Sequence, residues 1–205
     1  MQLIVGLDIS TSTIGWAGLF IENKQIKNVV YGYYKPLKNK DDKINFLLQT
    51  KKDILNLIKN LIIKDQIIDD IKICVEDILL FTKNTTATTV TSLAAINRVL
   101  CVSLYEDYNN VSLLPVQTIR AKLRRVVNSE ITISKELVPE TVEKIIKKYD
   151  SNWAFEYQLN KKGKMIIENY DKADGIAVAL SFAYINNYLE DSNDKKRSGK
   201  PTRTK

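Results

Sequence analysis

The sequence contains no histidine, and this absence restricts the chemistry available to the protein. It excludes Ser-His-Asp and Cys-His nucleophilic schemes, most zinc sites, and the usual general base at neutral pH. Any catalysis must therefore use carboxylates, lysines, hydroxyl groups or a hard metal ion bound by oxygen atoms.

Cysteine and long apolar runs are also scarce. Cys74 and Cys101 fall within an expected strand and an expected helix, and we expect both to be reduced core residues. Two thiols do not make a zinc site, which takes about four ligands. No apolar run approaches about 18 residues, and Met1-Gln2 leads straight into an expected strand without a basic region. We therefore expect a cytoplasmic protein with neither a signal peptide nor a membrane partner.

Positive charge is abundant. Lys and Arg number 31 against 24 Asp and Glu, which gives a net charge of +7. This balance fits a polyanionic partner, although many lysine-rich proteins share it. The wealth of Lys, Ile and Asn is typical of an AT-rich genome, such as that of a bacteriophage or another virus.

Apolar periodicity predicts one mixed α/β domain over residues 1–190. Three strands joined by short polar turns indicate an antiparallel meander, and two later strands alternate with helices. We expect the fourth strand to lie parallel to the first, giving a five-stranded mixed sheet of three antiparallel strands plus two parallel ones, flanked by helices. The expected strands span residues 2–9, 13–21, 25–35, 71–77 and 111–116, and the expected helices span residues 43–63, 85–107, 117–125, 135–149 and 170–189.

Two segments stand apart from this pattern. In residues 152–168, the aromatic residues Trp153, Phe155 and Tyr157 alternate before a polar turn, which indicates an inserted β-hairpin. The basic tail, residues 191–205, has the composition of a disordered segment. It serves either as a nonspecific DNA tether or as a passive solubilising end.

The first strand carries a carboxylate where burial makes charge costly. Residues 3–7 form an apolar run typical of a central strand covered on both faces. Asp8 follows in the same strand, and it should be paired, protonated or bound to a cation. A satisfied structural aspartate explains this residue equally well when it is considered alone.

Three further acids are expected near Asp8. Glu76 ends the fourth strand at the edge of the sheet where the first strand also ends. Asp171 and Asp174 lie three residues apart at the start of the last helix, so they share a face. Acids at a helix start also cap amides and complement the dipole, which explains Asp171 better than Asp174.

These motifs, in this order, resemble those of RuvC-type Holliday junction resolvases, a family with the RNase H-like fold. The resemblance covers roughly residues 2–190 in order and spacing. It rests on Gly6-Leu7-Asp8-Ile9-Ser10, Val75-Glu76 and Asp171-Lys172-Ala173-Asp174-Gly175, with further support from Thr82-Lys83-Asn84 and Pro115-Val116-Gln117-Thr118-Ile119-Arg120.

The resemblance implies that Asp8, Glu76, Asp171 and Asp174 are a catalytic and metal-binding tetrad. It implies an endonuclease that resolves four-way or branched DNA by paired symmetric nicks. Carboxylates suit Mg²⁺, with Mn²⁺ as an alternative, and two such ions can clamp both oxygens of an in-line displacement. Symmetric nicks on a two-fold junction call for a C2 homodimer, with the helix at 85–107 as the candidate interface.

Contacts to DNA are expected from basic and polar residues near the acids. Phosphate contacts from such residues would position DNA without reading its sequence, although a solvated helix face explains any single one equally well. Phe81 either wedges the junction centre or packs beneath its loop. The candidates are Phe81, Lys83, Asn84, Arg120, Lys122, Arg124 and Arg125.

Three other functions deserve comparison. Actin-like sugar and acetate kinases share the first motif, but they need a duplicated domain and a Gly-rich adenosine site, and this chain has only seven glycines. The nuclease module of CRISPR effectors shares Gly-Leu-Asp followed by Gly-Trp-Ala, although the compact chain favours a stand-alone resolvase. The third alternative is a broader RNase H-like nuclease that acts on flaps, forks or branched DNA.

Overall fold

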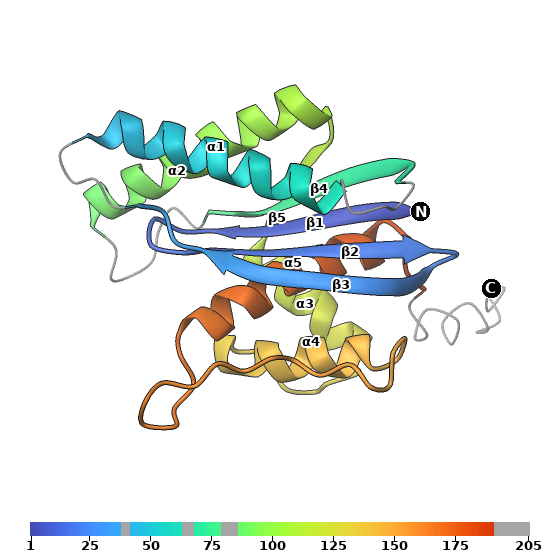
Figure 1. Ribbon diagram of the computed structural model, residues 1–205. Coiled ribbons are helices and arrows are strands. Elements are labelled where there is room, and N and C mark those ends of the chain that lie inside the picture. The colour runs from blue at the N-terminus through green and yellow to red at the C-terminus, as the bar shows by residue number, and fades with distance from the viewer. Residues whose placement is uncertain (38–41, 63–67, 79–85, 191–205) are drawn as a thin grey trace, which may run out of the picture.

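The computed structural model describes residues 1–37, 42–62, 68–78 and 86–190, and it has three layers (Figure 1). A five-stranded sheet forms the middle layer, with helices α1 and α2 on one face and α3, α4 and α5 on the other. The strands are β1 (Gln2–Ile9), β2 (Ile14–Glu22), β3 (Gln25–Tyr34), β4 (Asp70–Asp77) and β5 (Val111–Pro115). The helices are α1 (Lys43–Ile62), α2 (Ala87–Tyr108), α3 (Val116–Val126), α4 (Val138–Ile146) and α5 (Glu168–Ile185), with a 3-10 turn, η1 (Lys135–Leu137), before α4.

The strand order is β3-β2-β1-β4-β5, which confirms the predicted sheet. Strands β1, β2 and β3 pair antiparallel, whereas β4 pairs parallel to β1 and β5 pairs parallel to β4. The crossover helix α1 connects β3 to β4 above the sheet (Figure 1). The fold is therefore the RNase H-like arrangement expected from the sequence.

Alternate residues of β1 enter two separate cores. Leu3, Val5 and Leu7 are fully buried beneath α1 and α2. Ile4 points the other way, into the core that α3, α4 and α5 form against the sheet. The prediction of a central strand covered on both faces is thus confirmed, and Asp8 belongs to the same face as Ile4 because side chains alternate along a strand.

Helix α2 is apolar but only partly covered. Among the described residues, it is the one helix whose length and composition would suit a membrane span, with a mean hydropathy of 1.4 over its most apolar window. Ile96, Leu100 and Leu104 anchor it on the sheet. Only 28% of that window is buried, so the outer side of α2 remains available for other contacts.

The segment at 152–168 does not form the expected pair of regular strands. Its only strand pairing is an isolated bridge between Leu159 and Met165 around the predicted turn. The aromatic residues instead pack against β3, where Tyr31 stacks on Phe155 with ring centroids 5.3 Å apart. Alternating aromatics thus reflect packing on an existing sheet rather than pairing within a new one.

Two other boundaries differ from expectation. The helix predicted at 135–149 begins as the 3-10 turn η1 and ends at Ile146, and the last helix runs from Glu168 to Ile185. Both cysteines carry free thiols, as expected. The loop at 79–85 and the tail at 191–205 lie outside the described residues.

Candidate active site

The first turn of α5 lies in backbone contact with the sheet. A Cβ atom at Gly15 would lie 1.8 Å from the carbonyl oxygen of Asp171, and one at Gly6 would lie 2.4 Å from that of Gly175. Neither separation leaves room for a side chain, so glycine is required at both positions. Because Gly15 pairs directly with Asp8, this contact brings the start of α5 to the end of β1.

All four predicted acids lie on the α5 face of the sheet. Leu7 pairs with Val75, so the next residues along the parallel strands, Asp8 and Glu76, are neighbours. Asp171 and Asp174 approach from α5, and the carboxylates of all three other acids influence Asp8 electrostatically. The structure therefore brings together the four residues that the sequence singled out.

Crowding and burial disfavour the charged forms of these acids. Burial raises the pKa of Asp8 well above its ordinary value, and the carboxylates of Glu76 and Asp174 raise it further. Burial, with a contribution from Asp174, raises the pKa of Glu76 to about 7. Burial also raises the pKa of Asp174, although Arg120 and Lys135 oppose this shift. Full ionisation at neutral pH thus requires additional positive charge.

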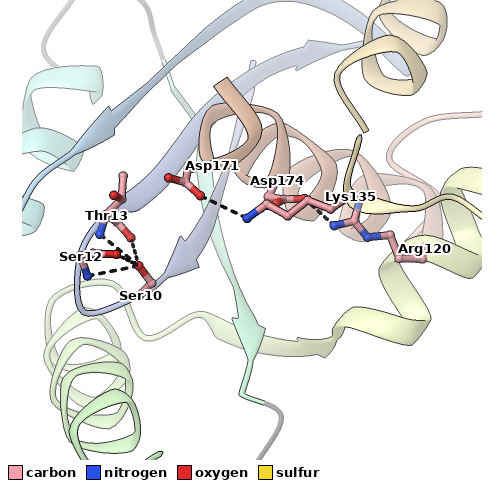
Figure 2. Close-up of polar contacts among 7 residues, drawn as sticks. All are labelled: Ser10, Ser12, Thr13, Arg120, Lys135, Asp171 and Asp174. Atoms are coloured by element: carbon pink, nitrogen blue, oxygen red, sulfur yellow. Dashed lines mark hydrogen bonds and ion pairs between the residues drawn. The ribbon is translucent and has the colours of Figure 1, made fainter. Parts of the chain in front are cut away.

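Two basic side chains supply part of that charge (Figure 2). Arg120, from α3, donates from Nη2 to Oδ1 of Asp174 over 2.6 Å. Lys135, from η1, lies 3.4 Å from Oδ1 of Asp171 and 3.7 Å from Oδ2 of Asp174. Burial lowers the pKa of Lys135, but the carboxylates of Asp174, Asp171 and Asp8 outweigh it and give a net increase.

Arg120 was predicted to contact DNA, and it lies at the edge of the acidic cluster instead of on an open surface. Its side chain is only 16% exposed. Its Nη1 atom is buried and has no hydrogen-bond partner among the described residues. One guanidinium nitrogen therefore holds Asp174, and the guanidinium as a whole belongs to the buried part of the site.

The other predicted DNA contacts fall into two groups. Arg124 and Arg125 are exposed on α3, whereas Lys122 is half-buried with its ammonium 5.7 Å from the ring centre of Tyr184. Phe81, Lys83 and Asn84 lie outside the described residues. Arg120 and Arg124 share one side of α3, where they line a surface hollow of about 300 Å³ together with Gln117, Thr132 and Ile133.

Sequence reasoning missed Lys135. The residue occurs in Ser134-Lys135-Glu136-Leu137, at the start of an expected amphipathic helix, and nothing in that pattern distinguishes it from other surface lysines. Its position beside Asp171 and Asp174 depends on the packing of α4 against α5. Only tertiary structure reveals this contact.

The donor atoms suit a hard divalent cation. Carboxylate oxygens are the ligands that Mg²⁺ prefers. Burial, and after it the neighbouring carboxylates, raise the pKa values of Asp8 and Glu76, and a bound cation would favour the charged forms of both acids. As the side chains lie, no three acids or cysteines among the described residues group closely enough to hold one ion. Asp171 and Asp174 face Lys135 and Arg120 instead. Binding a metal would therefore require the carboxylates of these two acids to turn toward it.

The hydroxyl-rich turn after β1 satisfies its own polar groups (Figure 2). Ser10 donates from Oγ to the carbonyl oxygen of Thr13 over 2.6 Å, and it accepts from the amides of Thr13 and Ser12 over 3.0 and 3.3 Å. These two amides are therefore occupied. An open cradle for nucleotide phosphates, as in actin-like kinases, is not formed by this turn.

Comparison with known proteins places the fold among resolvases. The structure matches that of RuvC from Thermus thermophilus in complex with a Holliday junction substrate, with a TM-score of 0.59 and 12% identity. The match covers 91% of this chain and 96% of the RuvC chain. A yeast mitochondrial Holliday junction resolvase matches over 96% of this chain and 84% of its own, with a TM-score of 0.58 and 12% identity. No family model and no curated protein matches the sequence. The chain therefore has the fold of RuvC-type Holliday junction resolvases, at a sequence identity that leaves function to be argued from its own residues.

Proposed function

We propose that this protein is a metal-dependent endonuclease that resolves four-way DNA junctions by paired symmetric nicks. The observation that carries the proposal is the convergence of Asp8, Glu76, Asp171 and Asp174 from three separate elements onto one face of the sheet. Phosphodiester hydrolysis needs an activated water and stabilisation of a leaving oxyanion. Carboxylates that hold hard cations meet both needs without histidine.

The four acids would hold the metal. Asp8 is central among them and would be the main ligand, with Glu76, Asp174 and Asp171 completing the set. Bound Mg²⁺ or Mn²⁺ would supply the activated water and the positive charge for the leaving oxygen. The acids stand on two strands and one helix start, so their backbones are fixed before substrate arrives.

Arg120 and Lys135 would serve the same site from its basic side. They neutralise Asp174 and Asp171 in the described arrangement. Because they lie directly against these two acids, a phosphate that reaches the acidic cluster would come close to both cations. We infer that they attract the DNA backbone toward the acidic cluster, which would otherwise repel it.

A homodimer would provide the two active sites that symmetric nicking requires. The outer side of α2 offers a continuous exposed stripe with helical spacing, apolar toward its end, where Val102 is 59% exposed and Tyr105 is 57% exposed. We propose that this stripe forms the two-fold interface, with the dimer acting in the cytoplasm. Its members are Thr88, Thr91, Ala95, Arg98, Val102 and Tyr105.

The deciding experiment compares nicking of a mobile four-way junction, a linear duplex and a flapped duplex, each with Mg²⁺ and with a chelator. Symmetric nicks that a ligase can seal, made only in the junction and only with Mg²⁺, are expected. Equal cutting of all three substrates would instead identify a general nuclease. Cleavage in the chelator would contradict the role of the acids, and a strictly monomeric protein on DNA would contradict paired resolution.

A further inference from the structure

The segment between α4 and α5 ends in a basic, projecting arm, defined here as residues 157–167. The arm extends from the α4 and α5 side of the sheet, at the end where α5 begins (Figure 1). It contains Lys161, Lys162 and Lys164 and no acidic residue. All three lysines are exposed, and none makes an ion pair within the described part of the chain. The arm thus carries a local charge of +3 that no described carboxylate pairs with.

The tip of the arm is an ordered turn rather than a loose loop. Asn160 accepts through Oδ1 from the amides of Lys162 and Lys164, over 2.8 and 3.1 Å. Its backbone amide donates to the carbonyl of Lys164 over 2.8 Å, and Gly163 adopts a φ of +72° that closes the turn. The three lysines are therefore presented on a defined backbone.

The base of the arm is bonded to the helix that carries two of the acids. Asn169, which is fully buried, accepts from the amide of Gln158 over 3.0 Å and donates to its carbonyl over 2.7 Å. One residue beyond Asp171, Lys172 donates to the carbonyl of Glu156 over 2.9 Å. These anchors alternate with Asp171 and Asp174 along α5, so the base of the arm is held against the helix start that bears these acids.

Lys172 illustrates how firmly this base is fixed. Its side chain is buried, and burial lowers its pKa. Its ammonium lies 5.4 Å from the ring centre of Phe155 and 5.9 Å from that of Tyr31. Tyr31 in turn accepts from the amide of Glu156 over 2.8 Å. This lysine is committed to anchoring the arm, unlike the three lysines at the tip.

We propose that the arm binds the phosphate backbone of a DNA helix beside the cleavage site. The inference rests on the proposed function and adds a second, more distant contact to it. Three unpaired lysines on an ordered tip suit a regular array of phosphates, which such side chains contact without reading sequence. Leu159, Met165 and Ile167 are also exposed, but the local charge of +3 opposes pairing of this arm with its copy in a second subunit.

The test replaces Lys161, Lys162 and Lys164 together by alanine and measures DNA binding by fluorescence anisotropy without divalent metal. A matched control replaces Lys24, Lys27 and Lys59, three exposed lysines with the same total charge. Lys24 and Lys27 lie near the β2–β3 turn, at the end of the sheet away from the start of α5 (Figure 1). A third variant substitutes arginine at the three arm positions and so keeps their charge.

The arm alanine variant should bind both junction and duplex about 10- to 100-fold more weakly near 0.1 M salt. For this variant, the slope of the logarithm of the association constant against the logarithm of the salt concentration should become shallower by about 0.9 for each phosphate that the arm no longer neutralises. The control variant should match the wild type more closely in slope, and the arginine variant should restore binding. Thermal melting should be unchanged, because the substituted side chains are exposed.

Two outcomes would overturn the proposal. Equal salt slopes for the arm and control variants would show that the arm does not bind phosphates. A change in sedimentation without a change in slope would identify the arm as a subunit interface. Plain duplex reports binding by the arm even if the wild-type protein fails to resolve junctions, so failure of the proposed function remains distinguishable from failure of the arm.

Discussion

The two faces of strand β1 have different roles, one in packing and one in the candidate active site. On the α1 and α2 face, Leu3, Val5 and Leu7 of β1 form a continuous apolar contact. On the α5 face, the same strand offers Ile4, then Gly6, then Asp8. The first face is packed along its whole length. The second changes from an apolar side chain to glycine, which has no side chain, and then to a carboxylate at the end of the strand. A single strand thus supports the fold with one side and places a carboxylate with the other.

Adjacent carboxylates in β4 repeat the comparison. Glu76 faces the acidic cluster, and burial raises its pKa to about 7. Asp77 belongs to the opposite face, where its Oδ1 atom lies 3.1 Å from Nη2 of Arg98 on α2. The two residues are adjacent in sequence, but their side chains lie on opposite faces of the sheet. Their substitutions therefore separate catalytic from structural effects.

The largest effect is expected from Asp8→Asn. Loss of this carboxylate should reduce junction cleavage by at least about 10³-fold, because the metal ions would lose their central ligand. Binding of the junction without metal should be retained. Nicking rates and binding isotherms on the same substrate measure the two effects, with Asp77→Asn as the control on the other face. Cleavage at the wild-type rate by the Asp8 variant would rule out the site.

The next effect concerns the contact between α5 and the sheet. Gly15→Ala would place a methyl group against the carbonyl of Asp171, and it should destabilise the protein by about 3 kcal/mol and impair cleavage. Gly18 lies in the same strand on the opposite face, where an added Cβ atom would lie 3.2 Å from a Val30 methyl group. Gly18→Ala should cost about 1 kcal/mol or less. Equal losses in urea unfolding would show that the close approach of α5 is not special.

The third effect is a pH dependence of stability in the metal-free protein. The pKa of Glu76 is raised from 4.5 to about 7 in the folded state, so between these values the folded protein keeps a proton that the unfolded chain has released. The free energy of unfolding should therefore fall as pH rises from about 4.5 to about 7. Glu76→Gln should remove roughly 1–3 kcal/mol of this dependence and stabilise the protein at pH 8.

Chemical denaturation at pH 5 and pH 8, with a chelator present, measures this dependence. Asp77→Asn, on the opposite face of the sheet, provides the control. A wild-type protein that becomes more stable between these pH values would contradict the raised pKa of Glu76. Added Mg²⁺ should selectively stabilise the wild type at pH 8, because a bound cation relieves the repulsion among ionised acids.

The smallest effect is expected from Asp77→Asn itself. The carboxylate of Asp77 is 34% exposed and its Arg98 partner is 50% exposed, so water screens their attraction. The substitution should change the free energy of unfolding by about 0.5 kcal/mol or less. Urea unfolding at pH 7 tests this value. A loss comparable to that of Gly15→Ala would mean that the two faces are less different than their chemistry indicates.

The sequence also predicts the two faces to different degrees. Apolar alternation and turn residues were sufficient for the antiparallel meander of β1, β2 and β3 and for the burial of β1. Burial cost drew attention to Asp8, but the set of Asp8, Glu76 and the pair in α5 was predicted through the resemblance of three motifs to those of RuvC-type resolvases. Lys135 was not, because an amphipathic helix start carries lysines for many reasons. In the segment at 152–168 the turn was predicted correctly but the regular strands were not, because aromatic residues that pack on β3 alternate in the same way as the residues of a paired strand.

The anchoring of the arm by Asn169 has a consequence for how such a protein can be altered. The amide of Asn169 fixes Gln158, whereas the hydrogen bonds of the tip close within residues 158–166. Loop tips of this kind tolerate changes in length and composition well. The tip can therefore be lengthened, shortened or replaced while its base and the start of α5 stay in place.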